Sequence, residues 1–325
     1  MLLYILRRIA SAISVVIVTL VASFALFFLA PTDPGGVICG PHCTPDRLSD
    51  IKSSLGLDQP AVEQIGLYMK GIVVGRDYDR SGVTTHCSAP CLGYSYTLGQ
   101  PVTKLLLQAL PVTVSIVLGG AVVYLIVGIL TGTIAAQVRG TPLDKVTVGA
   151  TLLVGSIPYF VFAVLVALYA TFLPTSQYTS FFTNPLAWAS GLLAAWLTIG
   201  VTNSASYTRY ARASMIESLG QDFVRTARSK GISERRVVYR HGLRAALTPV
   251  ATIFGIDLAF QLTGAIFTES IFGLPGIGLL TLRAFNQYDL PVLMGGVLVG
   301  SVVLVVMNLV VDIVYTFLDP RVRLG

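Results

Sequence analysis

The sequence predicts an all-α integral membrane protein with six transmembrane helices. Of the 325 residues, 54% are hydrophobic and only 12% are charged, about half the charged share of an ordinary soluble domain. The charges are clustered, so that long apolar runs lie between them, and a helix needs about 20 apolar residues to cross the hydrocarbon core. The runs are Ile9–Ala30, Val112–Ala136, Val146–Leu173, Leu186–Ala205, Leu247–Thr268 and Val292–Leu318.

These runs are expected to be helices, because backbone amides in lipid must be satisfied within their own segment. Their Leu, Val, Ile and Ala residues lack the period-two alternation of a membrane barrel. Arg7 and Arg8 precede the first run, as basic residues precede the core of a signal peptide. That run is nevertheless about 22 residues long and ends in Ala30-Pro31 without a small-residue cleavage pattern, which favours a retained helix.

Basic residues alternate between the loops. With six spans, 15 of the 22 Lys and Arg residues fall on one side, nine of them in segment 206–246. Segment 31–104 holds six basic and seven acidic residues, and segment 174–185 has no charge. Because cytoplasmic loops carry the excess of Lys and Arg, both termini and segment 206–246 are expected in the cytoplasm, and segment 31–104 outside. Topology then explains the net charge of +6, and nucleic acid is not expected as a partner.

All four cysteines lie in the large outer segment, at Cys39, Cys43, Cys87 and Cys91. An oxidising compartment favours two disulfides, although spacing alone does not choose among the three pairings. The disulfides could close two small loops, 39–43 and 87–91, or could link one pair of neighbouring cysteines to the other. His42 and His86 adjoin Cys43 and Cys87, so a zinc site is the alternative, but thiolates are seldom kept reduced outside the cytoplasm.

The basic segment 206–246 predicts a helix of about two turns, Phe223–Lys230. Asp222 is a suitable N-cap, and Gly231 can take the left-handed conformation that ends a helix. A second helix is predicted from Ser233 to Pro249, with Glu234 in its first turn. The amphipathic short helix fits either of two surroundings: lipid headgroups, with arginines on anionic lipid, or a groove of a cytoplasmic partner.

Sequence motifs add a family resemblance. Arg225–Gly231, then His241–Arg244 and Pro249, resemble the EAA loop of binding-protein-dependent ABC importer permeases, particularly the oligopeptide and dipeptide branch. Segments in the same order along nearly the whole chain also match that branch: Tyr4–Arg8, Ala30–Pro34, Leu55–Pro60, Glu269–Gly278 and Leu318–Arg321. The cysteine-bearing portions, 37–43 and 78–91, look like additions. Thr226-Ala227 stands where many members have Glu-Ala-Ala, which puts acidic pairing there in doubt.

The resemblance implies a type I ABC importer permease fold, with residues 1–325 as one transmembrane domain in the cytoplasmic (inner) membrane. It further implies import of oligopeptides or dipeptides by alternating access. The implied partners are a homologous second permease subunit, two cytoplasmic ATPases or one fused ATPase, an extracytoplasmic peptide-binding protein, and membrane lipid. ATP and Mg²⁺ would be bound by the ATPases. Contact with them is assigned to Phe223, Val224, Arg225, Thr226, Ala227, Arg228, Lys230 and Gly231.

Asp257 lies in the middle of the fifth span, where an uncharged residue is expected from the resemblance. It shares a helix face with Gln261, four residues on. A charge at membrane depth is costly and usually faces a cavity or a partner. We therefore predict that Asp257, Gln261 and Glu269 line the translocation pathway, the alternative for Asp257 and Gln261 being a structural contact with the second permease subunit.

Neither ATP hydrolysis nor other catalysis is expected of this chain. No G-x-x-x-x-G-K-[ST] motif occurs, because none of the five lysines follows a glycine. The three histidines fall in segments of different character, and neither catalytic residues nor a resident metal is predicted. Rival functions are a permease for nickel, glutathione or another small solute, an ion-coupled secondary transporter, and a membrane scaffold. Internal repeats and several midplane charges would favour the secondary transporter, and Asp257 alone points that way.

The predicted orientation can be tested with single introduced cysteines and a membrane-impermeant thiol reagent in intact cells. A cysteine near residue 65 should be labelled, because segment 31–104 is predicted outside. One near residue 235 should be labelled only after permeabilisation. Labelling near residue 235 in intact cells, or none near residue 65, would reverse the assignment.

Overall fold

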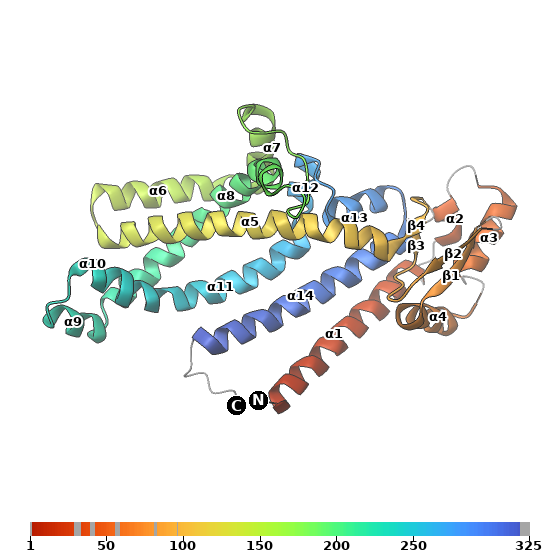
Figure 1. Ribbon diagram of the computed structural model, residues 1–325, viewed down its shortest axis with the longest axis horizontal. Helices are drawn as coiled ribbons and strands as arrows, with labels where there is room; N and C mark the ends of the chain where they lie inside the picture. The colour runs from red at the N-terminus through yellow and green to blue at the C-terminus, as the bar shows by residue number, and fades with distance from the viewer. Residues whose placement is uncertain are drawn as a thin grey trace. The chain divides into compact units, whose positions relative to one another are not determined.

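Helices make up most of the chain, as its apolar composition requires. The computed structural model describes residues 2–28, 34–39, 43–55, 59–80, 83–95 and 97–318. The helices (Figure 1) are α1 (Leu2–Phe28), α2 (Pro34–Cys39), α3 (Pro45–Leu55), α4 (Ala61–Val74), α5 (Val102–Gln137), α6 (Pro142–Ser156), α7 (Tyr159–Tyr169), α8 (Pro185–Leu219), α9 (Asp222–Ser229), α10 (Glu234–Arg236), the π-helix η1 (Val237–Gly242), α11 (Leu243–Gly264), α12 (Ile266–Phe272), α13 (Ile277–Asn286) and α14 (Leu290–Leu318).

These residues gather into two compact units. The first comprises residues 1–113 and 275–305, and the second comprises residues 114–274 and 306–325, so α5 and α14 belong partly to each. Several residues of the predicted motifs lie outside the described residues: Ala30–Asp33, Gly56–Asp58 and Asp319–Arg321, together with His42.

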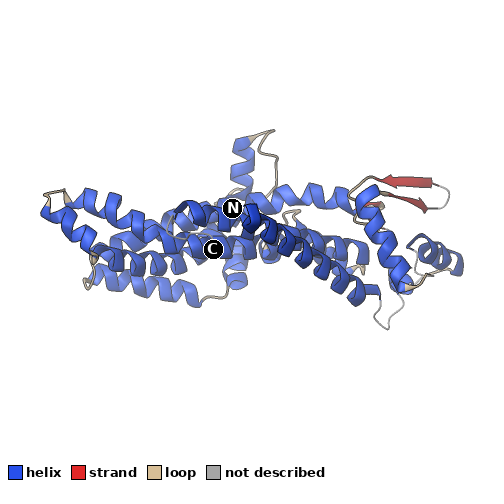
Figure 2. Ribbon diagram, turned by 90° about the horizontal axis from the view of Figure 1, so that it is seen from below, coloured by secondary structure: helices blue, strands red, loops and turns tan. Residues whose placement is uncertain are grey.

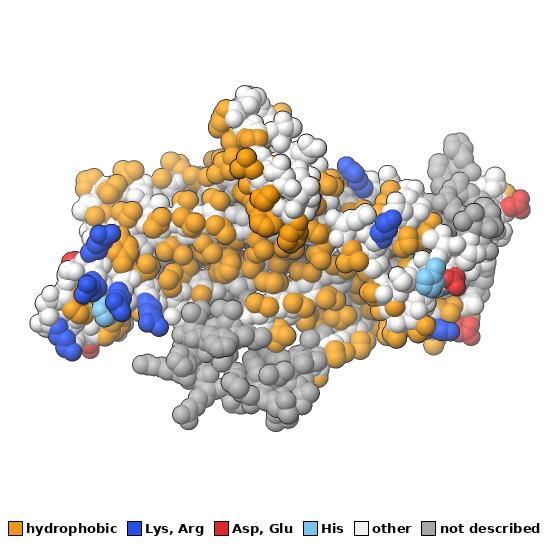
Figure 3. All heavy atoms as spheres, viewed as in Figure 1, with side chains coloured by type: hydrophobic (Ala, Val, Ile, Leu, Met, Phe, Trp, Pro, Cys, Tyr) orange, Lys and Arg blue, Asp and Glu red, His pale blue; other side chains and the backbone are white. Residues whose placement is uncertain are grey.

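Membrane-crossing helices account for the predicted apolar runs. Within the described residues, four stretches are long and apolar enough to span: Val102–Gln137, Pro185–Leu219, Glu234–Leu262 and Leu290–Val310. The bent pair of α6 and α7 can form a fifth span, and the apolar stretch Ile13–Ala25 lies within the 27-residue α1. The all-α membrane fold is thus confirmed. Hydrophobic side chains cover the visible face of α5 and α6, as contact with lipid requires (Figure 3).

The third predicted run, Val146–Leu173, is not one continuous helix. It breaks after Ser156, and α7 leaves α6 at an angle of 91°. Pro158 has no amide hydrogen, and it disfavours helical backbone at the residue before it. Ile157 is accordingly extended, with φ −79° and ψ 122°. The predicted run is thus a candidate span that Pro158 divides into two helices.

The helix after Ser233 also differs from its prediction. It does not end at Pro249: α10, η1 and α11 follow one another to Gly264, and Pro249 lies inside α11. A proline within a helix leaves a carbonyl without its usual amide donor. Two hydroxyl groups of α8 supply donors nearby, since Ser218 Oγ donates to the Gly242 carbonyl and Ser214 Oγ to the Ala246 carbonyl, each at 2.8 Å. Ser233 makes no side-chain capping bond.

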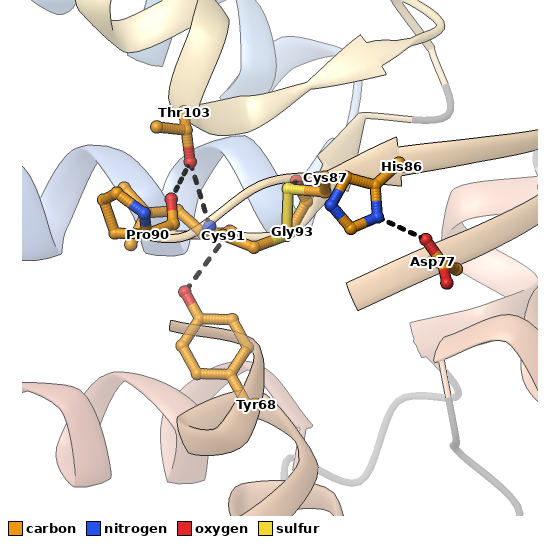
Figure 4. The surroundings of a disulfide bond; sticks show 9 residues. Tyr68, Asp77, His86, Cys87, Pro90, Cys91, Gly93 and Thr103 are labelled. Atoms are coloured by element: carbon orange, nitrogen blue, oxygen red, sulfur yellow. Dashed lines mark hydrogen bonds and ion pairs between the residues drawn. A yellow bond between two sulfur atoms is a disulfide. The ribbon is translucent and has the colours of Figure 1, made fainter. Parts of the chain in front are cut away.

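Between α4 and α5, the first unit contains short strands that were not predicted from the sequence. β1 (Arg76–Arg80) pairs antiparallel with β2 (Val83–Cys87), and β3 (Tyr94–Ser95) pairs with β4 (Gln100–Pro101). Figure 2 shows the longer hairpin as red arrows. Its register places Asp77 opposite His86, and their side chains lie 2.5 Å apart (Figure 4).

Two disulfides confirm the prediction for the four cysteines and choose between its open pairings. Cys39 bonds Cys43, and Cys87 bonds Cys91, so each closes a small loop. With their sulfur atoms in disulfides, these residues offer no thiolate to a metal. The second disulfide is buried with Tyr78 and Tyr94, whose rings stack 5.5 Å apart.

Three hydrogen bonds hold the chain around that disulfide (Figure 4). Tyr68 donates to the Leu92 carbonyl at 3.3 Å, and burial raises the pKa of this phenol. Thr103 Oγ1 donates to the Pro90 carbonyl and accepts from the Leu92 amide. These bonds fix this loop against the first turn of α5.

A buried carboxylate anchors the start of α14 in the same unit. Asp289 is 3% exposed and accepts a hydrogen bond from Ser95 Oγ. Burial raises the pKa of Asp289, while the hydroxyl bonds oppose that shift. Beside it, Val102, Leu106, Ala284, Val292 and Leu293 form an apolar core.

In the second unit, α5 and α8 approach each other closely along glycines of α5. A Cβ added at Gly132 would lie 2.6 Å from the Thr208 carbonyl oxygen, which is backbone and cannot rotate away. Nearby, Thr131 Oγ1 and Thr208 Oγ1 share a hydrogen bond of 2.7 Å, and Trp196 donates to the Ser115 carbonyl at 2.9 Å. Small residues therefore set the distance between these two spans.

Gly132→Ala should destabilise the protein, because the added methyl group forces α5 and α8 apart. Overpacking of this kind costs about 1–3 kcal/mol. Gly149→Ala on α6 is the matched control, since a Cβ there meets nothing within 4 Å. The thermal midpoint of the purified protein should fall only for Gly132→Ala; equal midpoints would contradict the close approach.

Candidate functional site

A cavity of about 470 Å³ lies among the helices of the second unit. Six helices (α5, α6, α7, α8, α11 and α12) and the break between α6 and α7 contribute to its wall. Its polar groups are Tyr159, Thr202, Asn203, Ser206, Gln261 and Thr268, and its other lining residues are Val117, Val154, Gly155, Ile157, Pro158, Ile199 and Ala265. Among the described lining residues there is no Asp, Glu, Lys, Arg or His. The wall can therefore offer hydroxyl and amide groups to a ligand, but no fixed charge.

The break in the third span positions one edge of this cavity. Because the chain turns at Pro158, the Tyr159 side chain reaches α12, where its hydroxyl lies 2.5 Å from Thr268 Oγ1. Both residues line the cavity. A straight helix would have carried Tyr159 onward along the α6 axis, so the proline creates this part of the site.

Gln261 connects the cavity to a buried polar chain. Its Nε2 donates to the Tyr124 hydroxyl at 3.3 Å, and its Oε1 is buried without a hydrogen-bond partner among the described residues. The Tyr124 ring lies 4.6 Å from the Tyr207 ring, and Tyr207 donates to Asp257 Oδ2 at 2.9 Å. Three helices thus share one network.

The predicted pathway residues separate into different environments. Gln261 lines the cavity, whereas Asp257 and Glu269 are not among its lining residues. Asp257 is held by Tyr207, which offsets part of the cost of a charge at membrane depth. Glu269 is completely buried. Asp257 and Gln261 lie four residues apart on α11, but only Gln261 lines the cavity.

The short helix of the basic segment forms as α9, and two of the residues assigned to the ATPase contact are buried against its own chain. Val224 and Ala227 are buried and pack against Val237, with Leu219 and Ile232 around them. Phe223, by contrast, is 45% exposed, and Arg225, Thr226 and Lys230 are exposed beside it. Val224 and Ala227 therefore hold α9 to its own chain. The outward face of α9 consists of Phe223, Arg225, Thr226 and Lys230.

The boundaries of α9 follow two local features. Gln221, not Asp222, is the N-cap residue, and Asp222 lies in the first helical turn, where its charge suits the helix dipole. Gly231 has φ +73°, the left-handed conformation predicted for it. Across that turn, the Arg228 guanidinium makes two bonds to Glu234, at 2.6 and 3.0 Å. This pair is exposed, so it contributes no more than about 1 kcal/mol.

Comparison with known proteins decides the family. Residues 128–324 match the family described as "Binding-protein-dependent transport system inner membrane component", and residues 1–117 match its N-terminal counterpart. The chain is a member of this family. It is 36% identical to a putative peptide transport system permease protein of Brucella abortus, over 98% of each chain. It is also 32% identical to a probable peptide ABC transporter permease protein of Sinorhizobium fredii and 31% identical to the dipeptide transport system permease protein of Escherichia coli, covering 98–99% of each chain.

Membership makes this permease a multi-pass protein of the inner membrane and a transport component. Permeases of this family work with a separate ATPase and a substrate-binding protein. In this permease, the cavity and α9 lie in the same compact unit, and α8 and α11 connect them.

An ion pair between α6 and α8 of the permease was also not predicted from the sequence. Asp144, in the first turn of α6, accepts two bonds from the Arg212 guanidinium of α8, at 2.6 and 2.7 Å. Asp144 also accepts a hydrogen bond from the Gly140 amide at 2.9 Å. The two residues are 68 positions apart, and no local pattern relates them. The same holds for Asn203, Thr202 and Ser206, which look like ordinary polar residues of a long span.

Proposed function

We propose that this permease forms half of the membrane pathway of an ATP-driven importer of oligopeptides or dipeptides, working by alternating access. The observation that carries the proposal is similarity over 98–99% of the chain to permeases described as acting on peptides or dipeptides. A homologous second permease subunit completes the pathway. Two cytoplasmic ATPases, or one fused ATPase, bind ATP and Mg²⁺, and an extracytoplasmic binding protein delivers the peptide.

The composition of the cavity supports a peptide substrate. Peptides vary in side-chain charge but share amide groups, and a wall of hydroxyl and amide side chains can pair with amides of any peptide. The neutral wall imposes no charge preference of its own, and Gln261 has an unpaired oxygen to offer. A nickel ion would favour imidazole, thiolate or carboxylate ligands, and the lining residues that the structure describes include none. We therefore assign Gln261 to the pathway, with Asp257 and Glu269 as supporting residues behind its wall.

Coupling to ATP hydrolysis is assigned to α9. Its outward residues Phe223, Arg225, Thr226 and Lys230 form the contact with an ATPase. Its inward residues Val224 and Ala227 press on Val237 and Leu219, which belong to η1 and to the end of α8. A displacement of α9 thereby passes to the helices that carry Asn203 and Gln261. In this arrangement segment 206–246 and both termini are cytoplasmic, and segment 31–104 faces the binding protein.

Reconstitution tests the function directly. The permease, its second permease subunit, the ATPases and the binding protein are placed in vesicles, and uptake of labelled dipeptides and longer peptides is measured with ATP. ATP-dependent uptake that unlabelled peptides inhibit is expected. Transport of nickel or another non-peptide solute that excess peptide fails to inhibit would contradict the substrate assignment.

Phe223→Ala should reduce both peptide uptake and the amount of ATPase that copurifies, because the exposed ring is lost from the contact. Truncation of an aromatic residue at the centre of an interface costs about 2 kcal/mol or more. Phe285→Ala is a matched control, since Phe285 is 65% exposed on α13, outside segment 206–246. The proposal fails if Phe223→Ala keeps normal ATPase binding and normal uptake while the protein remains in the membrane.

A further inference from the structure

An ion pair ties α6 to α8, which lie side by side in the second unit (Figure 1). The Arg212 guanidinium donates two bonds to the Asp144 carboxylate, and the two side chains are 25% and 5% exposed. A two-bond fork of this kind fixes the orientation of both groups as well as their distance. The Arg228–Glu234 pair has the same chemistry, but its side chains are 43% and 59% exposed, so water screens it. The Asp144–Arg212 pair is therefore the firmer link.

The loop before α6 holds the carboxylate end of this link. The Gly140 amide donates to Asp144 Oδ2 at 2.9 Å, and Thr141 is the N-cap residue of α6. Gly140 has φ +84°, a conformation that residues with a side chain rarely adopt. Asp144 is thus fixed relative to its own helix, and a displacement of the carboxylate carries α6 with it.

The guanidinium end belongs to a part of α8 that is fastened to the next helices along the chain. Met215 is completely buried and packs with Val238 and Ala246. The hydroxyl groups of Ser214 and Ser218 donate to carbonyls of α11 and η1, each at 2.8 Å. These contacts lie within two turns of Arg212 on α8, so the same stretch of helix holds η1 and α11 on one side and α6 on the other.

The far end of α6 forms part of the cavity wall. Val154 and Gly155 line the cavity, as do Ile157–Tyr159 at the break that follows. The 15 residues of α6 rise about 22 Å between the end that carries the ion pair and this break. A single helix therefore joins the ion pair to the edge of the cavity.

We propose that Asp144 and Arg212 are positioning residues for transport, because their ion pair makes α6 move with α8. This inference rests on the proposed function, in which an ATPase displaces α9. Val224 and Ala227 would pass that displacement to η1 and the end of α8, and the ion pair would pass it to α6 and the cavity edge. Apolar packing is non-directional, so α6 without the pair would be able to slide along α8 instead of moving with it.

The ratio of solute imported to ATP hydrolysed tests this proposal in vesicles that hold the complete importer. Asp144→Asn and Arg212→Gln should each lower that ratio about tenfold, the scale expected of residues that couple two sites. ATP hydrolysis and copurification of the ATPases should stay near wild type, because the outward face of α9 is unchanged. Lys145→Gln is the matched control, since it removes the charge of an exposed side chain in the same turn of α6 and should leave the ratio unchanged.

A double variant and a conservative variant separate coupling from stability. Asp144→Asn/Arg212→Gln should lower the ratio no further than either single change, because both changes break the same contact. Arg212→Lys keeps the charge but replaces the fork with a single ammonium contact. Its ratio should fall even where its thermal midpoint equals that of the wild type, so it serves in place of a single variant that fails to fold.

Two results would overturn the proposal. A normal ratio in all three single variants of the pair, with only a lower thermal midpoint, would assign the pair to stability alone. Additive losses in the double variant would show that the two residues act independently. Because the ratio is measured with whichever solute the wild-type importer carries, an error in the peptide assignment leaves this test intact. An error in the assignment of α9 would appear separately, as normal ATPase binding by Phe223→Ala.

Discussion

The exclusion of water from the hydrocarbon core is the constraint on which this structure depends. Without water, each backbone amide must find a partner in its own helix, and each charged side chain is costly. Residues 146–208 contain no Asp, Glu, Lys or Arg at all. The bent third span, the uncharged loop between α7 and α8 and the apolar half of α8 all come from this stretch, and their polar groups are hydroxyls and amides.

Those neutral polar groups pair with one another, which leaves a cavity able to accept a neutral or variably charged solute. Tyr159 bonds Thr268 across its edge, and Gln261 bonds Tyr124 behind it. The one carboxylate at this depth in α11, Asp257, is held by Tyr207 and is not among the cavity-lining residues. A charge outside the lining can stabilise the network while the described cavity wall stays uncharged.

In segment 206–246 the energetics change, because water screens the exposed charges. The Arg228–Glu234 pair is exposed and worth little, so the apolar contact of Val224 and Ala227 with Val237 holds α9 in place. The π-helix η1 and the interior Pro249 lie directly beyond that contact. Serine hydroxyls from α8 bond to the carbonyls of this irregular region. Such helix irregularities often occur at functional sites, and here one lies between the proposed ATPase contact and the cavity.

The sequence by itself determined the membrane class, the apolar runs, the short basic helix with its stop at Gly231, and the oxidation state of the cysteines. Each of these depends on local composition or on a single backbone requirement, such as the positive φ of Gly231. Tertiary structure alone decided which cysteines pair, which face of α9 is buried, and that Gln261 reaches the cavity while Asp257 does not. It also decided the Asp144–Arg212 pair and the wall of Asn203, Thr202 and Ser206. These features arise where helices distant in sequence meet, and the periodicity of one helix does not specify the side chains of its neighbour.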